Sequence, residues 1–130
     1  MTIRFDENFS VSAADLWAII GTVDRVDWVP GVTHCLFDGR VRRLQLPGAG
    51  DIAEEIVIRD EGSMRLVYRC IESPQPMEFH EARVSIEALS ETECRFVWEA
   101  DIKPAAFVPF LRGSMQGALE QLRVVAAQST

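Results

Sequence analysis

The period of the hydrophobic pattern changes twice along this chain. From residue 32 to residue 103, apolar and polar side chains alternate, which is typical of strands with one buried face. Turn signals such as Asp38-Gly39 and the run from Pro47 to Gly50 interrupt the alternation. The pattern predicts strands with the approximate bounds 33–38, 40–46, 52–60, 64–72, 78–89 and 94–103. Because their connections are short, we expect consecutive antiparallel pairing in a meander.

Both ends of the chain carry helical spacing. A first strand at about residues 2–11 leads to Ser12, a candidate helix cap, and to a short apolar helix that ends near Gly21. Residues 23–29 are predicted to form a second short helix, which Pro30 terminates. Residues 107–127 are predicted to form a long amphipathic helix, because apolar side chains recur along one of its faces. These side chains are Leu111, Met115, Ala118, Leu119, Leu122 and Val125.

The expected strands and the long last helix predict an α+β fold with one strongly bent sheet. An antiparallel sheet of this kind is apolar on one face, which another element has to cover. The last helix is the obvious candidate for that cover. With 130 residues the chain has the size of one domain, so we expect a single domain over residues 1–130.

The charge balance narrows the range of partners. Thirteen Lys and Arg stand against twenty Asp and Glu, and a formal charge of -7 is the wrong sign for a protein that neutralises nucleic-acid phosphates. Apolar runs such as residues 16–20 are far shorter than the roughly 20 residues that cross a bilayer. The first residues lack the apolar core of a signal peptide. We therefore expect a cytoplasmic protein that neither binds nucleic acid nor inserts into a membrane.

The residues that usually carry metal, disulfide or cofactor chemistry lack the necessary spacing. Cys35, Cys70 and Cys94 form no C-x-x-C motif and are expected to be reduced, packed thiols. His34 and His80 occur in none of the histidine motifs that bind zinc. The sequence contains no G-x-G-x-x-G run. We expect neither a metal nor a cofactor.

The order of the elements and a set of short motifs resemble a known family. The motifs are Trp28-Val29-Pro30-Gly31-Val32, Gly39 followed by Arg42, Glu54 ahead of Ile56 and Asp60, residues 66–71, residues 73–76, and Trp98 with Lys103-Pro104. Together they resemble the START / birch-pollen-allergen (SRPBCC) superfamily and, more narrowly, its bacterial polyketide cyclase/dehydrase and lipid-transport group. The resemblance covers nearly the whole chain. It implies a helix-grip fold: a curved seven-stranded antiparallel sheet around the C-terminal helix, with two short helices after the first strand.

Four polar side chains interrupt the apolar face of the expected sheet. Because strand residues alternate between faces, Arg42, Glu54, Tyr68 and His80 share their face with apolar neighbours. The first three match the family pattern, whereas His80 stands where relatives commonly have Tyr. We expect Arg42 and Glu54 to form a bidentate ion pair on neighbouring strands. The pattern leaves open whether this pair is structural or faces a ligand.

The candidate site consists of these polar groups and nearby large apolar side chains. His80, Tyr68 and Glu54 are candidate catalytic residues, although buried Tyr and His side chains are often only hydrogen-bonded structural groups. The resemblance implies a cavity between the sheet and the last helix. Its expected ligand-binding residues are Arg42, Glu54, Tyr68, His80, Trp98, Phe107, Phe110 and Met115. The segments 46–51 and 73–77, rich in Gly and Pro, are expected to gate this cavity.

Three functions remain open at this point. The favoured hypothesis is a carrier or sensor that binds a small hydrophobic or polyketide-like molecule, because that function needs only a cavity. The alternative is a polyketide cyclase or dehydratase, in which Arg42 polarises a carbonyl, Tyr68 donates a hydrogen bond and His80 or Glu54 moves a proton. The third is an interaction protein with a filled cavity. Whether the chain forms a homodimer is also left open.

Overall fold

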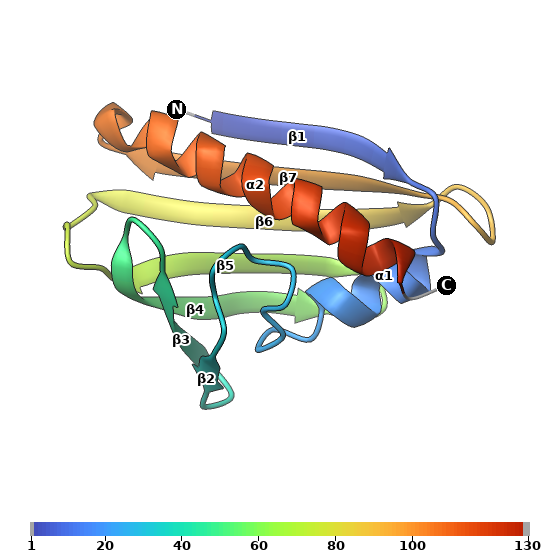
Figure 1. Ribbon diagram of the computed structural model, residues 1–130, viewed down its shortest axis with the longest axis horizontal. Coiled ribbons are helices and arrows are strands. Elements are labelled where there is room, and N and C mark those ends of the chain that lie inside the picture. Colours follow the sequence, from blue (N-terminus) through green and yellow to red (C-terminus); the bar gives the residue numbers. More distant parts are fainter. Residues whose placement is uncertain (1, 129–130) are drawn as a thin grey trace.

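A strongly curved antiparallel sheet and one long helix dominate the computed structural model, which describes residues 2–128 (Figure 1). The strands follow the expected bounds within a few residues. They are β1 (Thr2–Phe9), β2 (Cys35–Phe37), β3 (Val41–Leu46), β4 (Gly50–Asp60), β5 (Arg65–Glu72), β6 (Phe79–Ala88) and β7 (Cys94–Lys103). The helical elements are α1 (Ala13–Ile20), the 3₁₀ turn η1 (Ala105–Phe107) and α2 (Val108–Ala127). The α+β, helix-grip architecture is confirmed.

The seven strands form a single sheet in the order β1-β7-β6-β5-β4-β3-β2. From β2 to β7 each strand pairs with its successor, so the expected meander is confirmed. The first strand does not pair with the second. It lies antiparallel to the last strand, with Ile3 opposite Ala100 and Phe9 opposite Cys94. This long-range pairing leaves β1 and the short β2 as the two edges of the sheet.

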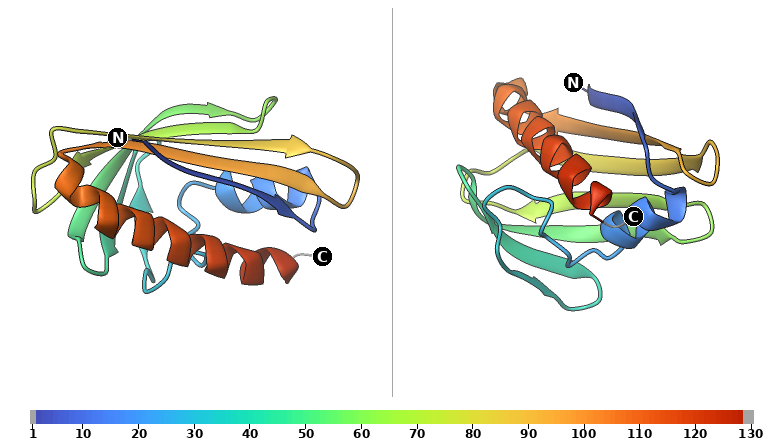
Figure 2. Two further views of the ribbon diagram at one scale, coloured as in Figure 1. Left: turned by 90° about the horizontal axis from the view of Figure 1, so that it is seen from above. Right: turned by 45° about the vertical axis from the view of Figure 1, so that its right-hand side comes forward.

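Helix α2 runs along the concave side of the sheet (Figures 1 and 2). Its buried residues include all of the expected apolar face except the half-buried Leu111. They pack on the inward side chains of β6 and β7, where Phe96 makes edge-on ring contacts with Phe9 and Trp98. No helix within residues 2–128 is long and apolar enough to cross a membrane.

Helix α1 begins and ends near the residues that the sequence indicates, but the glycine that follows it is needed for a different reason than expected. Ser12 caps the start, since its hydroxyl accepts a hydrogen bond from the Asp15 backbone N–H at 3.1 Å. Gly21 follows the helix in an ordinary right-handed conformation, with a φ of -74°. A Cβ at this position would come within 2.5 Å of the Trp17 ring. Glycine is therefore required here by packing against Trp17 and not by backbone conformation.

The second expected short helix, residues 23–29, is a series of turns instead. Its backbone forms isolated hydrogen bonds, from Arg25 to Thr22 and from Val29 to Val26. The Trp28 indole N–H donates to the Arg25 carbonyl at 3.2 Å and draws the segment into a turn. So short a segment, rich in β-branched residues and followed by proline, cannot offset the cost of starting a helix.

Candidate functional site

Two adjoining hollows lie between the curved sheet and α2. The inner chamber, beside Arg42, Tyr68 and Trp98, has a volume of about 90 Å³. The outer chamber, beside Phe107 and Phe110, has a volume of about 580 Å³. Five residues line both chambers: Leu46, Ile52, Glu54, His80 and Leu111. The chambers therefore meet at a shared wall that carries Glu54 and His80.

Arg42 and Glu54 form an ion pair at the inner chamber. They are directly opposite each other on β3 and β4, and Arg42 Nε donates to Glu54 Oε1 at 2.8 Å. The bidentate pair expected from the sequence is not formed, because Arg42 Nη1 donates instead to the Val23 carbonyl at 2.9 Å. Burial is the largest influence and acts to lower the pKa of Arg42, but the charge and hydrogen bond of Glu54, together with Tyr68 and Cys35, raise the pKa overall. Arg42 thus keeps its charge in the buried site.

Tyr68 lines the same chamber. Its ring lies under the guanidinium of Arg42, whose Cζ is 4.6 Å from the ring centroid. The hydroxyl oxygen accepts a hydrogen bond from the Trp98 indole N–H at 3.2 Å. Burial, helped by the negative charge of Glu54, raises the pKa of Tyr68. Tyr68 therefore keeps its proton, which has no acceptor among residues 2–128 and remains available to a ligand.

His80 occupies the junction of the two chambers in its neutral form. Its Nδ1 accepts a hydrogen bond from the Cys70 backbone N–H at 2.9 Å. Burial lowers the pKa of His80, and Arg42 lowers it further, whereas the carboxylates of Glu54 and Glu81 oppose the shift. Because Nδ1 is an acceptor, the single proton of the neutral ring is on Nε2.

This environment predicts a pH dependence of stability. The folded state holds the pKa of His80 below its ordinary value of 6.5, so the unfolded chain binds more protons once the pH falls below that value. The free energy of unfolding should decrease as the pH falls from about 7 to about 5. Urea unfolding across this range should show the decrease in the wild type and a flatter profile in His80→Gln.

The exposed imidazole provides the control for this experiment. His34→Gln should keep the wild-type dependence, since His34 has no buried contact to lose. The carboxylates with lowered pKa values, such as Asp6 and Glu81, lose their contribution at lower pH, through about pH 4. Equal slopes in the wild type and in His80→Gln would contradict the assignment to His80.

The outer chamber is formed mainly by apolar groups from three connections. The β3–β4 turn, the β5–β6 connection and the start of α2 meet there. The Phe110 ring lies so close to Gly48 that a Cβ at Gly48 would come within 2.8 Å of it. Cys70 also lines this chamber, and burial raises the pKa of its thiol to about 11, so the thiol stays un-ionised. The segments 46–51 and 73–77 thus lie at the outer chamber, and their gating role stays a prediction.

The structure brings the eight sequence-predicted residues to these chambers. Arg42, Tyr68, Trp98 and Met115 line the inner chamber, Phe107 and Phe110 line the outer one, and Glu54 and His80 line both. Sequence reasoning missed Ile52, Leu111 and Ser114. Ser114 lies four residues before Ala118 on α2, so helical spacing alone could have placed it on the inward face.

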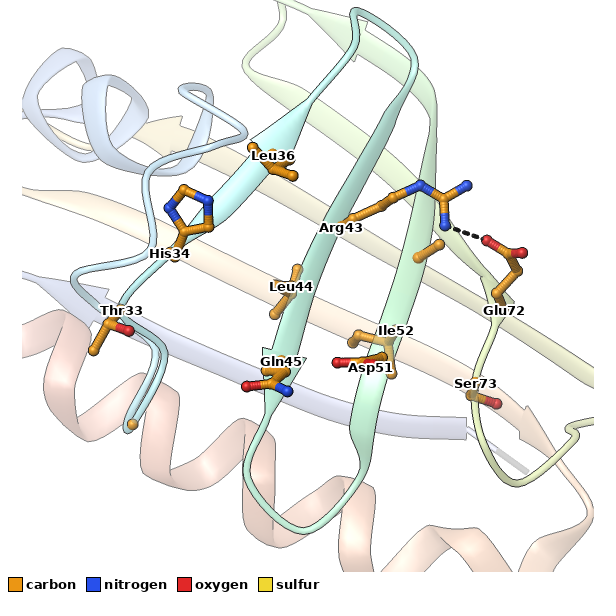
Figure 3. A pocket seen from close by; sticks show the side chains of 12 residues that line it. Thr33, His34, Leu36, Arg43, Leu44, Gln45, Asp51, Ile52, Glu72 and Ser73 are labelled. Atoms are coloured by element: carbon orange, nitrogen blue, oxygen red, sulfur yellow. Dashed lines mark hydrogen bonds and ion pairs between the residues drawn. The ribbon is translucent and has the colours of Figure 1, made fainter.

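A third hollow of about 550 Å³ lies on the opposite side of the sheet, over β2, β3 and β4 (Figure 3). Figure 3 shows the ion pair between Arg43 and Glu72 at its edge, with His34 across the groove. These three side chains are exposed to solvent. The groove is therefore less suited to an apolar molecule than the two chambers beneath α2, and it offers a reference surface for binding experiments.

Comparison with known proteins identifies a family and a fold. The family model described as "Polyketide cyclase / dehydrase and lipid transport" matches residues 2–127. No match to a curated protein is found. Among solved structures, the protein XoxI from Bacillus cereus is similar with a TM-score of 0.86 at 18% identity, over 97% of this chain and 95% of that one.

Two further solved structures are similar in the same way. A START superfamily protein from Mycobacterium smegmatis has a TM-score of 0.84 at 16% identity, over 99% of both chains. Norcoclaurine synthase from Thalictrum flavum, in complex with dopamine and hydroxybenzaldehyde, has a TM-score of 0.71 at 15% identity, over 100% of this chain and 88% of that one. At such identities the likeness shows the fold alone.

Proposed function

The chain belongs to the polyketide cyclase/dehydrase and lipid-transport family, and on that premise we propose that it binds a small, largely apolar molecule in the joined inner and outer chambers. The observation that carries this proposal is the shared wall. The same five residues line both chambers, which supports a single molecule whose apolar body lies in the outer chamber and whose polar end reaches the inner one. Ligand sites typically combine an apolar lining with a few polar groups in this manner.

The volumes of the two chambers indicate which part of the ligand fits in each of them. The outer chamber, at about 580 Å³, lies within the range of roughly 300–1,000 Å³ that is usual for ligand sites. The inner chamber, at about 90 Å³, is smaller than the cavity of about 150 Å³ that holds a benzene ring. We therefore place a small polar head group in the inner chamber and the apolar body in the outer one.

A cyclase or dehydratase is the second candidate, and one observation favours it. Glu54, Tyr68 and His80 all line the inner chamber, so a bound carbonyl compound would meet groups that can donate or accept a proton. The third hypothesis, an interaction protein with a filled cavity, has less support because the outer chamber alone has about 580 Å³. The proposed ligand is a small hydrophobic molecule in either of the first two cases.

Native mass spectrometry and NMR would test the binding function. We expect freshly purified protein to carry an additional small-molecule mass that denaturation removes. Titration with 2-acetylnaphthalene should shift the amide signals of residues around the two chambers, such as His80 and Leu111. The amide signals of the groove over β2, β3 and β4, such as that of Arg43, should stay unchanged. A clean mass together with no shifts at the chambers would contradict the proposal.

The same experiment separates a carrier from an enzyme. Any molecule released from the protein can be incubated with fresh protein and its mass measured again. An unchanged mass with an unchanged fragmentation pattern supports a carrier or sensor. Loss of water supports a dehydratase or a cyclase that dehydrates its product, and an unchanged mass with an altered fragmentation pattern supports cyclisation by addition.

A further inference from the structure

The histidine at the junction of the chambers is held in one tautomer by the backbone of β5. His80 comes from β6, and its Nδ1 accepts the Cys70 backbone N–H at 2.9 Å. A backbone amide can only donate, so Nδ1 has to be the unprotonated nitrogen of the neutral ring. Protonating Nδ1 would remove this hydrogen bond and leave a backbone N–H without its partner. His80 is therefore poorly arranged to act as a base through Nδ1.

The opposite nitrogen of the ring, Nε2, carries the proton and points away from the β5 backbone. His80 lines both chambers, and its side chain is buried, with 7% of the residue exposed. Within the described part of the chain, Nε2 has no hydrogen-bond acceptor. His80 Nε2 is not among the fully buried, unpartnered side-chain atoms of residues 2–128, so solvent reaches it and a ligand oxygen at the junction could replace that solvent as its acceptor.

The other polar groups of the inner chamber favour a neutral acceptor in the same place. The centroids of the Tyr68 and His80 rings are 6.0 Å apart, and both residues line the inner chamber, so the Tyr68 O–H and the His80 Nε2–H are two donors from one chamber wall. The charge of Arg42 is balanced by Glu54, which itself lines both chambers. A ligand carboxylate would meet the carboxylate of Glu54, whereas a ketone or aldehyde oxygen would not.

We propose that His80 determines ligand specificity by donating its Nε2–H to a neutral carbonyl oxygen, so that the chambers select an apolar molecule with a ketone or aldehyde head group. The inner chamber has room for a head group of roughly three non-hydrogen atoms, since a cavity of about 150 Å³ holds the six carbons of benzene and this chamber has about 90 Å³. An acetyl group has this size. The inference rests on the proposed binding function and adds the chemical class of the ligand.

The tautomer can be tested without any ligand. The nitrogen shifts and long-range proton couplings of the two imidazoles distinguish a proton on Nε2 from one on Nδ1, and His34→Gln leaves His80 as the only imidazole. At about pH 7.5, where a neutral ring is expected, we expect the Nε2–H pattern. An Nδ1–H pattern would overturn the assignment of His80 as the donor, whatever the protein binds.

Three probes of the same shape test the selectivity in the wild type. 2-Acetylnaphthalene, 2-isopropylnaphthalene and 2-naphthoate share one apolar body and differ in their head groups. Loss of a hydrogen bond that leaves a buried donor unpaired corresponds to about a tenfold change in Kd. We expect both comparison probes to bind about tenfold more weakly than the ketone. Equal affinities would overturn the inference alone, whereas binding of none of the three would contradict the proposed function itself.

Two substitutions then assign the selectivity to His80. In His80→Phe the ring shape remains but both nitrogens are lost, so the preference for the ketone over the hydrocarbon should disappear. His80→Gln retains an acceptor and a donor and should restore part of the preference. Unchanged selectivity in a folded His80→Phe would overturn the proposal. If His80→Phe fails to fold because Cys70 loses its partner, the tautomer and the three wild-type affinities still decide it.

Discussion

Replacing Arg42 with methionine is expected to lower the free energy of unfolding by about 3–5 kcal/mol. Methionine keeps the length of the side chain and removes its charge. Glu54, whose side chain is only 14% exposed, would then be a buried carboxylate without its partner at 2.8 Å. The Val23 carbonyl would lose the hydrogen bond that Arg42 donates to it, and the Tyr68 ring would lose its cation–π contact with the guanidinium. Urea unfolding, followed by tryptophan fluorescence, measures the loss directly.

The next residue along the strand supplies a matched control. Arg43 forms an ion pair with Glu72 on the opposite side of the sheet, and more than half of each side chain is exposed. Arg43→Met should cost less than about 1 kcal/mol, because solvent screens an exposed pair. The double variant Arg42→Met/Glu54→Leu should recover most of the stability, since it leaves no unpaired charge. Equal losses in Arg42→Met and Arg43→Met would show that burial of the pair is wrongly assigned.

Replacing Ser114 with phenylalanine is expected to weaken the binding of 2-acetylnaphthalene about 100-fold or more, equivalent to about 2.7 kcal/mol. Ser114 lies on α2 and lines the inner chamber of about 90 Å³. A cavity of about 150 Å³ is needed to hold one benzene ring, so the new side chain would occupy the space of the head group. Isothermal titration calorimetry of the wild type and the variant measures the change in Kd.

A second phenylalanine on the same helix tests whether position matters. Gln116 is exposed on the outer face of α2, and Gln116→Phe should bind the probe as the wild type does. Overpacking at Ser114 is expected to cost about 1–3 kcal/mol of stability, so the unfolding curve of Ser114→Phe has to be measured alongside its affinity. A folded Ser114→Phe with wild-type affinity would mean that the probe does not use the inner chamber.

The fold was largely predictable from local patterns, with two informative exceptions. Alternating apolar residues and turn signals are local properties, and they located the meander from β2 to β7 and the long helix α2. The pairing of β1 with β7 joins Ile3 to Ala100, and no local pattern encodes a contact over that separation. The turns at residues 23–29 depend on contacts of Trp28 and on the Arg42 guanidinium that binds Val23. The local cost of starting a short helix and the tertiary contact from Arg42 to Val23 together override the helical spacing there.

For the candidate site, the sequence by itself determined the face, and the tertiary structure decided the partners. Strand parity places Arg42, Glu54, Tyr68 and His80 on the concave side, because successive side chains have to alternate. Parity does not specify side-chain rotamers or the register between strands. Those decide that Arg42 gives one hydrogen bond to Glu54 and another to Val23. They also decide that His80 accepts from Cys70 at Nδ1 and keeps its proton on Nε2. The partner of each polar atom is fixed only when the sheet has closed around α2.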